Sequence, residues 1–548
     1  MEFKKNQIVE LYIDDIGNEG EGIGHIDGYA LFLKDAVIGD KVRAKIIKTK
    51  KNYGFARVEE VIEASKDRVS PRCSKARQCG GCTLQHLAYE KQLEYKFNKV
   101  KNCLERIGGL ENIEEKMEPI LGMEEPFYYR NKAQFPVGYD KEGNLITGFY
   151  AGRTHHIIDC THCMIQHPVN EQILLKVLDY MKKNNITAYD EKTHKGLVRH
   201  IVTRVGFKTG EIMVCLVVNG SKKNLRNLEM LVDSLTEVEG MTSICVNINK
   251  EKTNRILGSK IEEVYGKPYI YDYIGNVKYQ IGPLSFFQVN PTQTKVLYEK
   301  AMEYADLKGE ETVWDLYCGI GTISLFLAQK AKKVYGVEIV KEAIDDARLN
   351  AKMNGFDNAE FFVGKAEEVL PREYEKNGVY ADTIVVDPPR KGCDSKLLET
   401  MVKMAPKRIV YVSCDPATLA RDLKVLSEQG YEVEKVCAVD QFSHSSHVET
   451  VCLLSRGKVD GYVNVDLDTD KIVSKSKTGT ATYKEIKEYI NDKYGFTVSS
   501  LNIAQVKDKC GLNKRNNYNK GKEGHKVPAC PEKKEKAIKE AFAHFGLV

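Results

Sequence analysis

The stretch Val410-Tyr411-Val412-Ser413-Cys414-Asp415-Pro416-Ala417-Thr418-Leu419-Ala420-Arg421-Asp422 decides the fold class of this chain. Together with Ile409, its first residues form an apolar run that predicts a buried strand. Residues 413–416 break the run, and helical spacing resumes over 417–423. Ligands in open α/β sheets bind at the carboxyl ends of strands. Cys414 is therefore a candidate site residue, although a buried thiol is the commoner role of a cysteine.

Three further predicted strands end in residues that could bind a nucleotide-like ligand. Residues 312–323, which include Tyr317, predict a strand that ends in a glycine turn and opens a helix, a geometry that brings a ligand close to backbone amides. Glu338 closes the next strand, where an acid suits ribose hydroxyls. Residues 383–386 predict a strand that ends in Asp387-Pro388-Pro389-Arg390. The pattern Gly319-x-Gly321-x-x-Ser324 lacks the third Gly or Ala of the dinucleotide fingerprint, which disfavours NAD.

The first 62 residues predict a small all-β domain. Strand-like runs over 8–13, 30–33, 41–47 and 55–61 alternate with turns, of which the Gly-rich segment 17–22 is the clearest. The run from Lys41 to Arg57 holds seven Lys and Arg residues and no acid. Basic runs with interleaved aromatics suit nucleic acid, and a solvated charged face is the equal alternative.

A cysteine cluster follows this domain. Cys73, Cys79 and Cys82 have the spacing C-x5-C-x2-C, and Cys160 and Cys163 are candidates for a fourth ligand. Four cysteines can hold zinc or an iron–sulfur cluster, and spacing alone does not choose between them. The spacing differs from that of three-cysteine radical enzymes, which disfavours radical chemistry.

Composition excludes several classes of protein. No run reaches 18 apolar residues, and the first five residues lack an apolar signal region, so we expect a cytoplasmic protein without a membrane span. Fifteen cysteines in 548 residues do not indicate a disulfide scaffold. The length allows several domains.

The remaining segments predict a central domain and a basic extension. Residues 95–275 predict mixed α/β structure, in which Arg130, Lys132, Arg199 and Arg204 could contact phosphate or simply lie on the surface. From Arg456 onward the chain carries 19 Lys and Arg against 12 Asp and Glu. A polar linker over 474–482, a capping box at 482–485, a basic segment over 507–526 and an apolar stripe at 538–545 predict a small helical domain. It could bind RNA or serve as a packing appendage.

Taken together, residues 285–291, 313–324, 387–390, 411–422 and 440–451 closely resemble the RNA uracil-5-methyltransferase family. Within it the chain resembles the bacterial 23S ribosomal RNA branch, and Gly20-Glu21-Gly22-Ile23-Gly24 resembles its TRAM module, an OB-like RNA-binding barrel. The resemblance implies four parts: a TRAM barrel (1–62), an iron–sulfur and RNA-recognition domain (63–275), a Rossmann-like methyltransferase domain (276–455) and a helical accessory domain (456–548).

The resemblance also implies roles for single residues. Cys414 would be the nucleophile and Glu449 the base. S-adenosylmethionine would be bound by Gln288, Tyr317, Glu338 and Asp387. A 4Fe-4S cluster, with zinc as the alternative occupant, would be held by Cys73, Cys79, Cys82 and Cys163. Thr322 and Lys365 depart from the family pattern. The implied activity is methyl transfer to carbon 5 of a uridine in 23S ribosomal RNA. We expect the protein to be a monomer.

Three rival interpretations stay open from the sequence. An amino methyltransferase is one, because Asp387-Pro388-Pro389 is similar to its motif, but Arg390 replaces the aromatic residue and Cys414 would be idle. A silent RNA-binding or ribosome-assembly factor is another, against which the intact Cys414 and Glu449 argue. The third is formation of 5-methyluridine in transfer RNA.

Overall fold

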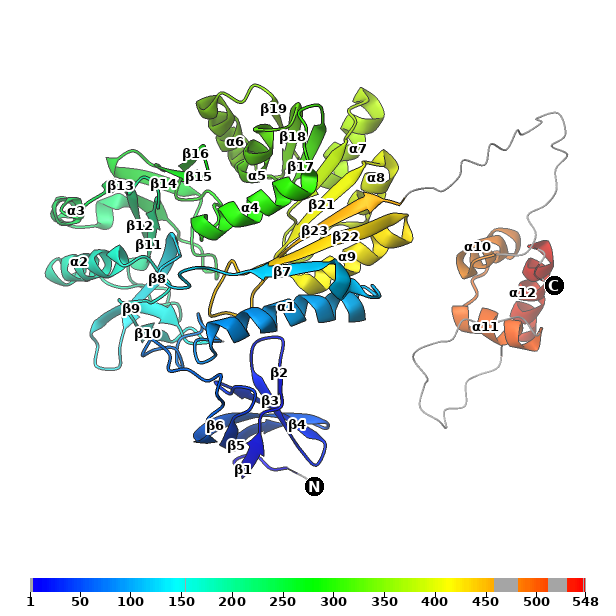
Figure 1. Ribbon diagram of the computed structural model, residues 1–548, viewed down its shortest axis with the longest axis horizontal. Coiled ribbons are helices and arrows are strands. Elements are labelled where there is room, and N and C mark those ends of the chain that lie inside the picture. The colour runs from blue at the N-terminus through cyan, green and yellow to red at the C-terminus, as the bar shows by residue number, and fades with distance from the viewer. Residues whose placement is uncertain (1–2, 153, 458–480, 511–529, 546, 548) are drawn as a thin grey trace. The chain divides into compact units, whose positions relative to one another are not determined.

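The structure is a computed structural model that describes residues 3–152, 154–457, 481–510, 530–545 and 547. The chain divides into two compact units, Met1–Lys458 and Val459–Val548, which are described separately (Figure 1). None of the helices in the described ranges is long and apolar enough to cross a membrane.

The N-terminal part forms the predicted all-β domain. Its six strands have the order β1-β5-β6-β4-β3-β2 and comprise β1 Ile8–Tyr12, β2 Asp15–Ile16, β3 Gly22–Ile26, β4 Tyr29–Lys34, β5 Lys41–Thr49 and β6 Tyr53–Glu63. The predicted turn over 17–22 is present, and Gly20 has a φ of +85°. A Cβ there would lie 2.7 Å from Leu84 Cδ2, so the turn requires glycine for both its backbone and its close packing.

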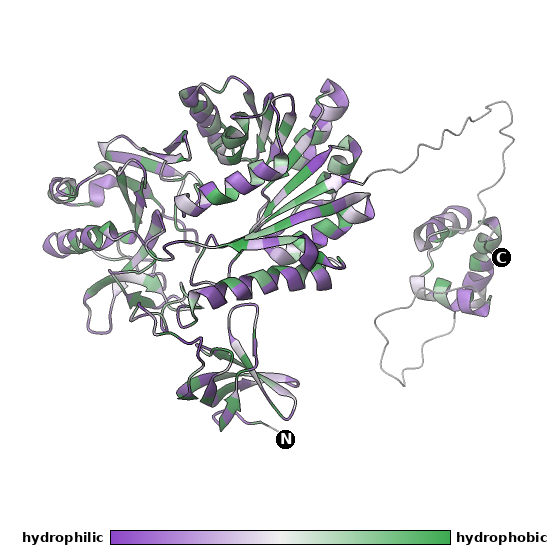
Figure 2. Ribbon diagram, in the orientation of Figure 1, coloured by the Kyte–Doolittle hydropathy of each residue, from purple (hydrophilic) through white to green (hydrophobic). Residues whose placement is uncertain are grey.

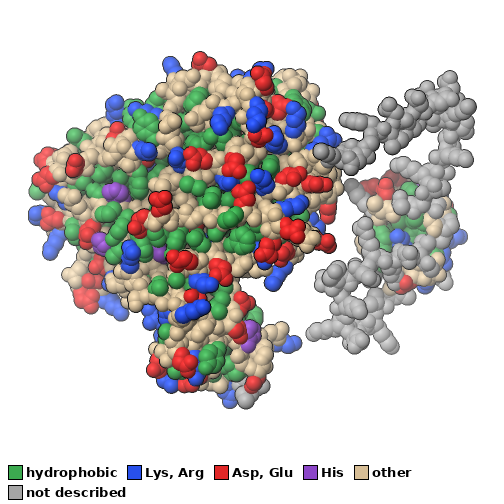
Figure 3. Space-filling model, viewed as in Figure 1, with side chains coloured by type: hydrophobic (Ala, Val, Ile, Leu, Met, Phe, Trp, Pro, Cys, Tyr) green, Lys and Arg blue, Asp and Glu red, His purple; other side chains and the backbone are tan. Residues whose placement is uncertain are grey.

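The basic run in this domain does not form an unopposed positive surface. Lys41 pairs with Glu63, Arg57 pairs with Glu59, and Arg43 pairs with the carboxylates of Glu10 and Glu60. Antiparallel pairing of β5 with β1 and β6 brings most of these acids alongside the run. On the face shown in Figure 3, Lys and Arg side chains are interspersed with Asp and Glu. The sequence did not reveal these pairs because all of the acids lie outside the basic run, before it on β1 or after it on β6.

The central part is built on a seven-stranded sheet. Its order is β10-β9-β8-β11-β12-β13-β14, with β8 Lys132–Tyr139, β9 Leu145–Tyr150, β10 Ile157–Asp159, β11 Val198–Val205, β12 Ile212–Val218, β13 Met241–Ile248 and β14 Lys260–Gly266. Strands β11 and β12 flank the turn at 208–210. Helices α2 Val169–Lys183 and α3 Leu228–Thr236 pack on the sheet, and the hairpin β15 Ile270–Ile274 and β16 Val277–Ile281 follows.

The third part holds an eight-stranded sheet of order β19-β18-β17-β20-β21-β23-β22-β7. Its strands are β7 Met117–Leu121, β17 Thr312–Leu316, β18 Lys333–Glu338, β19 Ala359–Val363, β20 Thr383–Val386, β21 Arg408–Ser413, β22 Tyr431–Val439 and β23 Glu449–Arg456. The first five in this order are parallel, whereas β23 returns antiparallel between β21 and β22. The direction of strand addition reverses between β17 and β20, which is where α/β sheets bind ligands.

Helices cover both faces of this sheet, and Figure 2 shows hydrophobic residues concentrated in its strands. One face packs against α4 Pro291–Ala305, α5 Thr322–Ala328 and α6 Lys341–Asn354, and the other against α1 Tyr89–Arg106, α7 Ala366–Asn377, α8 Ser395–Met404 and α9 Pro416–Glu428. Strand β21 alternates accordingly: Val410 and Val412 enter the first core, and Ile409 and Tyr411 enter the second.

Two elements from early in the sequence belong to this sheet. Strand β7 pairs in parallel with β22, and α1 packs beside α9. Both precede residue 275, which the sequence analysis takes as the end of the central domain. The domain boundaries themselves stay a prediction.

The second unit contains the predicted helices. They are α10 Tyr483–Tyr494, α11 Ser500–Lys509 and α12 Glu532–His544, packed around a small core that includes Ile538, Ala541 and Phe542. Thr482 and Glu485 form the predicted capping box at the start of α10. Most of the predicted linker at 474–482 and of the basic segment at 507–526 lies outside the described residues.

Candidate active site

The junction between β21 and α9 holds Cys414. Ser413 is the last residue of the strand, and its hydroxyl donates to the carbonyl of Asp415 at 3.0 Å. Asp415 caps α9, because its carboxylate accepts the N–H groups of Ala417 at 2.9 Å and Thr418 at 3.2 Å, and Pro416 follows as the first helical residue. The thiol of Cys414 is thereby fixed between a buried strand and a capped helix N-terminus.

Antiparallel pairing brings Glu449 close to this cysteine. The last pair of the β21–β23 ladder is Ser413 with Thr450, so Cys414 directly follows one paired residue and Glu449 directly precedes the other. Glu449 also contributes to the raised pKa of Cys414. Glu449 is the first residue of β23 and is buried. Two residues that lie 35 positions apart in the sequence are thus brought together by the sheet.

Electrostatics set the protonation of this pair. Burial raises the pKa of Glu449 to about 8, with a further contribution from Asp387, while Arg390 acts in the opposite direction. Burial also raises the pKa of Cys414 to about 11, reinforced by Glu449 and Asp387 and opposed by Arg390. A carboxyl with a pKa near neutrality is suited to proton transfer. The thiol needs assistance to become a thiolate, which is the nucleophilic form.

A cavity of about 240 Å³ opens onto Cys414. Its lining includes three residues that were not predicted site residues, namely Lys99, Arg390 and His447. The turn between β2 and β3 also contributes, through Asn18 and Glu19. Arg390 and His447 did carry a local signal, because they lie in the motifs 387–390 and 440–451. Lys99 reaches the cavity from α1, far away in sequence.

A second, narrow pocket lies at the carboxyl ends of β17 and β20. Gln288, Tyr317 and Asp387 line it, as the sequence analysis expects of residues that share a ligand. Glu338 lies beside the pocket, where its carboxylate accepts the N–H groups of Gly319 at 3.3 Å and Val340 at 3.0 Å. The four predicted cofactor residues therefore gather around one glycine turn.

Local backbone geometry shapes this pocket. Tyr317 has a φ of +71°, which is uncommon for an aromatic residue and is typical of functional sites. Gly321 has a φ of +82°, and a Cβ there would lie 3.2 Å from Ala347 Cβ. The Ser324 hydroxyl donates to buried Asp315, which explains why serine occupies the position of the third glycine in dinucleotide motifs. Burial raises the pKa of Asp315 to about 7.

Of the two residues that depart from the family pattern, Thr322 lines the narrow pocket and Lys365 does not. The Thr322 hydroxyl lies 2.9 Å from Tyr298 Oη, and Thr322 also lines the pocket. Lys365 is the residue that precedes α7, and its ammonium pairs with Glu368 at 3.3 Å.

The thiols of the predicted cysteine cluster affect one another electrostatically. Burial raises the pKa of Cys82 to about 12, and the thiols of Cys163, Cys79 and Cys73 add to this shift. The thiol of Cys160 donates to the carbonyl of His162 at 3.2 Å. Gly80 packs tightly, because a Cβ there would lie 3.0 Å from Gly152 Cα. Among the described residues, no group of three or more side chains has the geometry of a metal site.

Comparison with known proteins identifies the family. The family model described as tRNA (Uracil-5-)-methyltransferase matches residues 88–457, and the TRAM domain model matches residues 2–58. The chain belongs to the RNA uracil-5-methyltransferase family. Its N-terminal barrel is a TRAM domain, and its eight-stranded sheet is the fold of an S-adenosylmethionine-dependent RNA methyltransferase.

Relatives and a solved structure agree with this assignment. The methyltransferase is 53% identical over 453 residues to an RNA methyltransferase of Clostridium tetani, covering 82% of this chain and 97% of the relative. It is 52% identical to one of Halalkalibacterium halodurans, with the same coverage of both chains. The crystal structure of Pyrococcus abyssi tRNA (uracil-54, C5)-methyltransferase with S-adenosyl-L-homocysteine aligns with a TM-score of 0.66 and 29% identity, covering 81% of this chain and 100% of that one.

Two of the four basic residues considered for phosphate binding have other roles in the methyltransferase. Arg199 is buried, and its guanidinium donates to the carbonyls of Asn249 and Glu251 at 3.1 and 2.7 Å. Arg204 is buried and donates to the carbonyl of Ser285. Both alternatives, phosphate contact and a surface position, are therefore wrong for these two arginines, which are buried and satisfy backbone carbonyls of the loops beside their strand. Arg130 and Lys132 are half-buried, and burial lowers the pKa of Lys132 to about 7.

The raised pKa of Glu449 predicts a pH-dependent difference in stability between the wild type and Glu449→Gln. Folding favours the neutral acid, so its contribution to stability is full below the ordinary Glu pKa and is lost as the pH rises towards 8. Between pH 5 and 8, the unfolding free energy of Glu449→Gln minus that of the wild type should increase by up to about 1.4 kcal/mol per pH unit.

Urea titration followed by fluorescence of Trp314 measures this difference, because the chain has one tryptophan and it is buried in β17. Glu432→Gln, which changes an exposed carboxyl on the neighbouring β22, serves as the control. A difference between the wild type and Glu449→Gln that does not vary with pH would contradict the assigned cause of the shift.

Proposed function

We propose that this methyltransferase transfers a methyl group from S-adenosylmethionine to carbon 5 of a uridine in 23S ribosomal RNA, with Cys414 as nucleophile and Glu449 as base. The observation that carries the proposal is the strand register that sets a cavity-lining thiol close to a buried carboxyl. The pocket at Gln288, Tyr317 and Asp387 supports a methyl donor beside that cavity.

The chemistry requires both side chains. Carbon 5 of uracil is a poor nucleophile, so Cys414 first adds through Sγ to carbon 6 and turns the ring into an enolate. Carbon 5 then takes the methyl group, and the bond from the donor sulfur to that methyl breaks to leave S-adenosylhomocysteine. The Glu449 carboxylate removes the carbon 5 proton, the C5–C6 double bond re-forms and the C6–Sγ bond breaks. Covalent catalysis thus divides one difficult step into easier ones.

Two features assist the thiol in this scheme. The Arg390 side chain acts to lower the pKa of Cys414 and so offsets part of the increase that burial and the nearby carboxyls cause. Cys414 directly precedes the N-cap of α9, so it lies near the positive end of the helix dipole, which favours the thiolate form. The target uridine must also leave its stack to enter the cavity, at a cost of a few kcal/mol.

The four-cysteine segment would hold a 4Fe-4S cluster through Cys73, Cys79, Cys82 and Cys163. The donor set suits such a cluster in its chemistry and not in its side-chain geometry. Neighbouring thiols of the set raise the pKa of Cys82 and Cys163, and a bound cation would deprotonate them, but the described side chains do not form a metal site. When bound, such a cluster would supply a cross-link between distant segments, and no step of methyl transfer passes through it. Zinc would fill the same structural role.

Transfer RNA is the second candidate substrate. It is favoured by the Pyrococcus abyssi neighbour, whose substrate is transfer RNA. The 23S assignment is supported by the resemblance of the barrel and cysteine segments to the ribosomal branch.

Cys414→Ala should abolish formation of 5-methyluridine, because no other step makes carbon 5 nucleophilic. The test incubates unmodified 23S RNA and transfer RNA with S-adenosylmethionine and either the wild type or a variant. The RNA is then digested, and its methylated nucleosides are mapped by mass spectrometry. We expect one or a few methylated uridines in 23S RNA with the wild type and with Cys393→Ala, which removes a buried thiol outside the cavity. Methylated transfer RNA alone would establish the second candidate, and product from Cys414→Ala would refute the mechanism.

Anaerobically purified protein should contain about four iron atoms and four sulfides per chain if the centre is a 4Fe-4S cluster. Metal analysis and visible absorption measure this content, and Cys79→Ala should lower it. Cys103→Ala removes a thiol outside the cluster and should retain the iron. Stoichiometric zinc without iron would refute the cluster assignment.

A further inference from the structure

The loop between β22 and β23 is polar in sequence yet almost wholly buried. It spans residues 440–448 and ends directly at Glu449. Its buried polar members are Asp440, Gln441, Ser443, His444, Ser445 and Ser446. Buried polar groups need hydrogen-bond partners, so the segments that supply those partners determine the shape of the loop. We call this segment the base loop.

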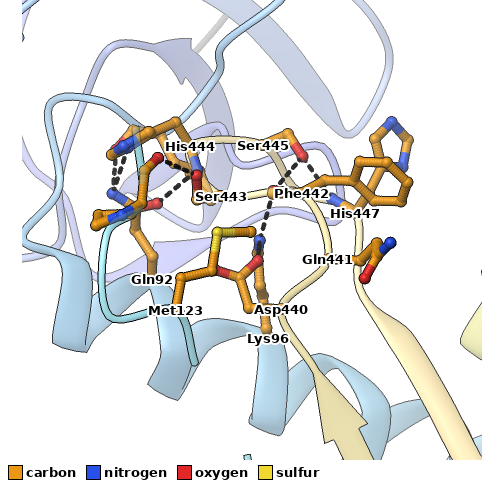
Figure 4. Close-up of polar contacts among 12 residues, drawn as sticks. Gln92, Lys96, Met123, Asp440, Gln441, Phe442, Ser443, His444, Ser445 and His447 are labelled. Carbon is orange, nitrogen blue, oxygen red and sulfur yellow. Dashed lines mark hydrogen bonds and ion pairs between the residues drawn. The ribbon is translucent and has the colours of Figure 1, made fainter. Parts of the chain in front are cut away.

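One face of α1 supplies many of these partners. Gln92, Lys96 and Lys99 are spaced i, i+4 and i+7, which places them on one face of the helix. Each contacts the base loop: Gln92 at His444, Lys96 at Asp440 and Phe442, and Lys99 at Ser446. Figure 4 shows Gln92 and Lys96 reaching from the helix to the loop. We call these three residues the α1 stripe.

Lys96 makes the most constrained contact of the stripe. Its side chain and that of Asp440 are both fully buried, with Nζ 2.5 Å from Oδ1. Nζ also donates to the carbonyl of Phe442 at 2.9 Å, and the Tyr89 hydroxyl donates to the other oxygen of Asp440 at 2.7 Å. A buried charge left without its partner is strongly destabilising, so this pair holds one geometry. Asp440 directly follows Val439, the cross-strand partner of Glu449.

His444 is held from three directions. The Gln92 carboxamide oxygen accepts its backbone N–H at 2.9 Å, and its carbonyl accepts the N–H groups of Thr83 and Leu84 at 2.8 and 3.0 Å. Its ring lies 4.3 Å from that of Phe127. His444 has a φ of +60°, an uncommon backbone geometry that persists only when neighbours enforce it.

The same helix also contacts the barrel. The Tyr95 hydroxyl donates to the carbonyls of Gly17 and Asn18 at 3.0 and 2.8 Å. The Lys99 ammonium donates to the carbonyls of Asn18 and Ser446, both at 2.9 Å, and so bridges the barrel turn and the base loop. The α1 helix therefore links the barrel to the residues beside the base.

We propose that the α1 stripe positions the base loop so that Glu449 meets the carbon 5 proton, with Lys96 as the principal positioning residue. The inference rests on the proposed function and extends it to residues that lie more than 300 positions before the base. The recorded partners of Lys96 belong to the base loop and not to the Cys414 junction. Addition of the thiol and methyl transfer therefore depend little on Lys96, whereas proton removal depends on it.

Single-turnover kinetics of Lys96→Met separate these steps. RNA carrying tritium at carbon 5 of uridine reports proton removal, and labelled S-adenosylmethionine reports methyl transfer. We expect tritium release to slow by roughly tenfold to a hundredfold, a fraction of what a general base contributes, while methyl transfer per folded protein changes little. The methylated covalent protein–RNA adduct should then accumulate and appear on denaturing gels with ordinary RNA.

Gln92→Met is the second variant, because it removes contacts to His444 without leaving a buried charge unpaired. It should show the same separation of the two rates, to a smaller extent. Lys101→Met is the matched control, since Lys101 lies on the same helix and pairs with exposed Glu114 at 2.8 Å. It should release tritium and transfer methyl at the wild-type rates.

The outcomes distinguish the two proposals. Wild-type protein that neither methylates RNA nor releases tritium would refute the proposed function. If the wild type is active but Lys96→Met and Gln92→Met slow methyl transfer and tritium release equally, the positioning role is refuted. Unfolding of both variants, detected by Trp314 fluorescence, would refute it too, because the stripe would then serve the fold alone.

Discussion

The antiparallel pairing of β21 with β23 is the constraint on which the active site depends. A purely parallel sheet would bring only carboxyl ends of strands to the ligand edge. Because β23 runs the other way, its first residue, Glu449, reaches that edge near Cys414, which directly follows β21. The backbone ladder thus fixes the spacing of two side chains that no local sequence pattern connects. Burial at the same edge raises the pKa of the carboxyl into the range that suits a base.

The surroundings of this pair are supplied by distant parts of the chain. The α1 helix and the segment after Cys82 reach the base loop, and the barrel contributes Asn18 and Glu19 to the cavity. The TRAM domain is therefore more than an appended RNA-binding module, since its turn forms part of the wall around Cys414. This arrangement suits a reaction that begins when a folded RNA presents one uridine.

Local patterns in the sequence were sufficient for the elements that end in site residues. Strand β20 matches its predicted range, and Thr482 and Glu485 form the expected capping box, because apolar runs, caps and breakers act over a few residues. Arg199 and Arg204 were misjudged, since their partners are carbonyls of segments about 50 and 80 residues away. Lys96 was missed for the same reason: a lysine on a charged helix gives no sign that its partner is a buried aspartate in another part of the chain.

The covalent step tests the account most directly. RNA in which 5-fluorouridine replaces uridine cannot lose a proton from carbon 5, so the adduct formed by Cys414 should persist after methyl transfer. We predict a protein–RNA complex that survives denaturation, requires S-adenosylmethionine and maps by mass spectrometry to the peptide containing Cys414. Absence of a complex despite methylation of ordinary RNA, or attachment at another residue, would contradict the central claim that Cys414 opens the reaction by adding to carbon 6.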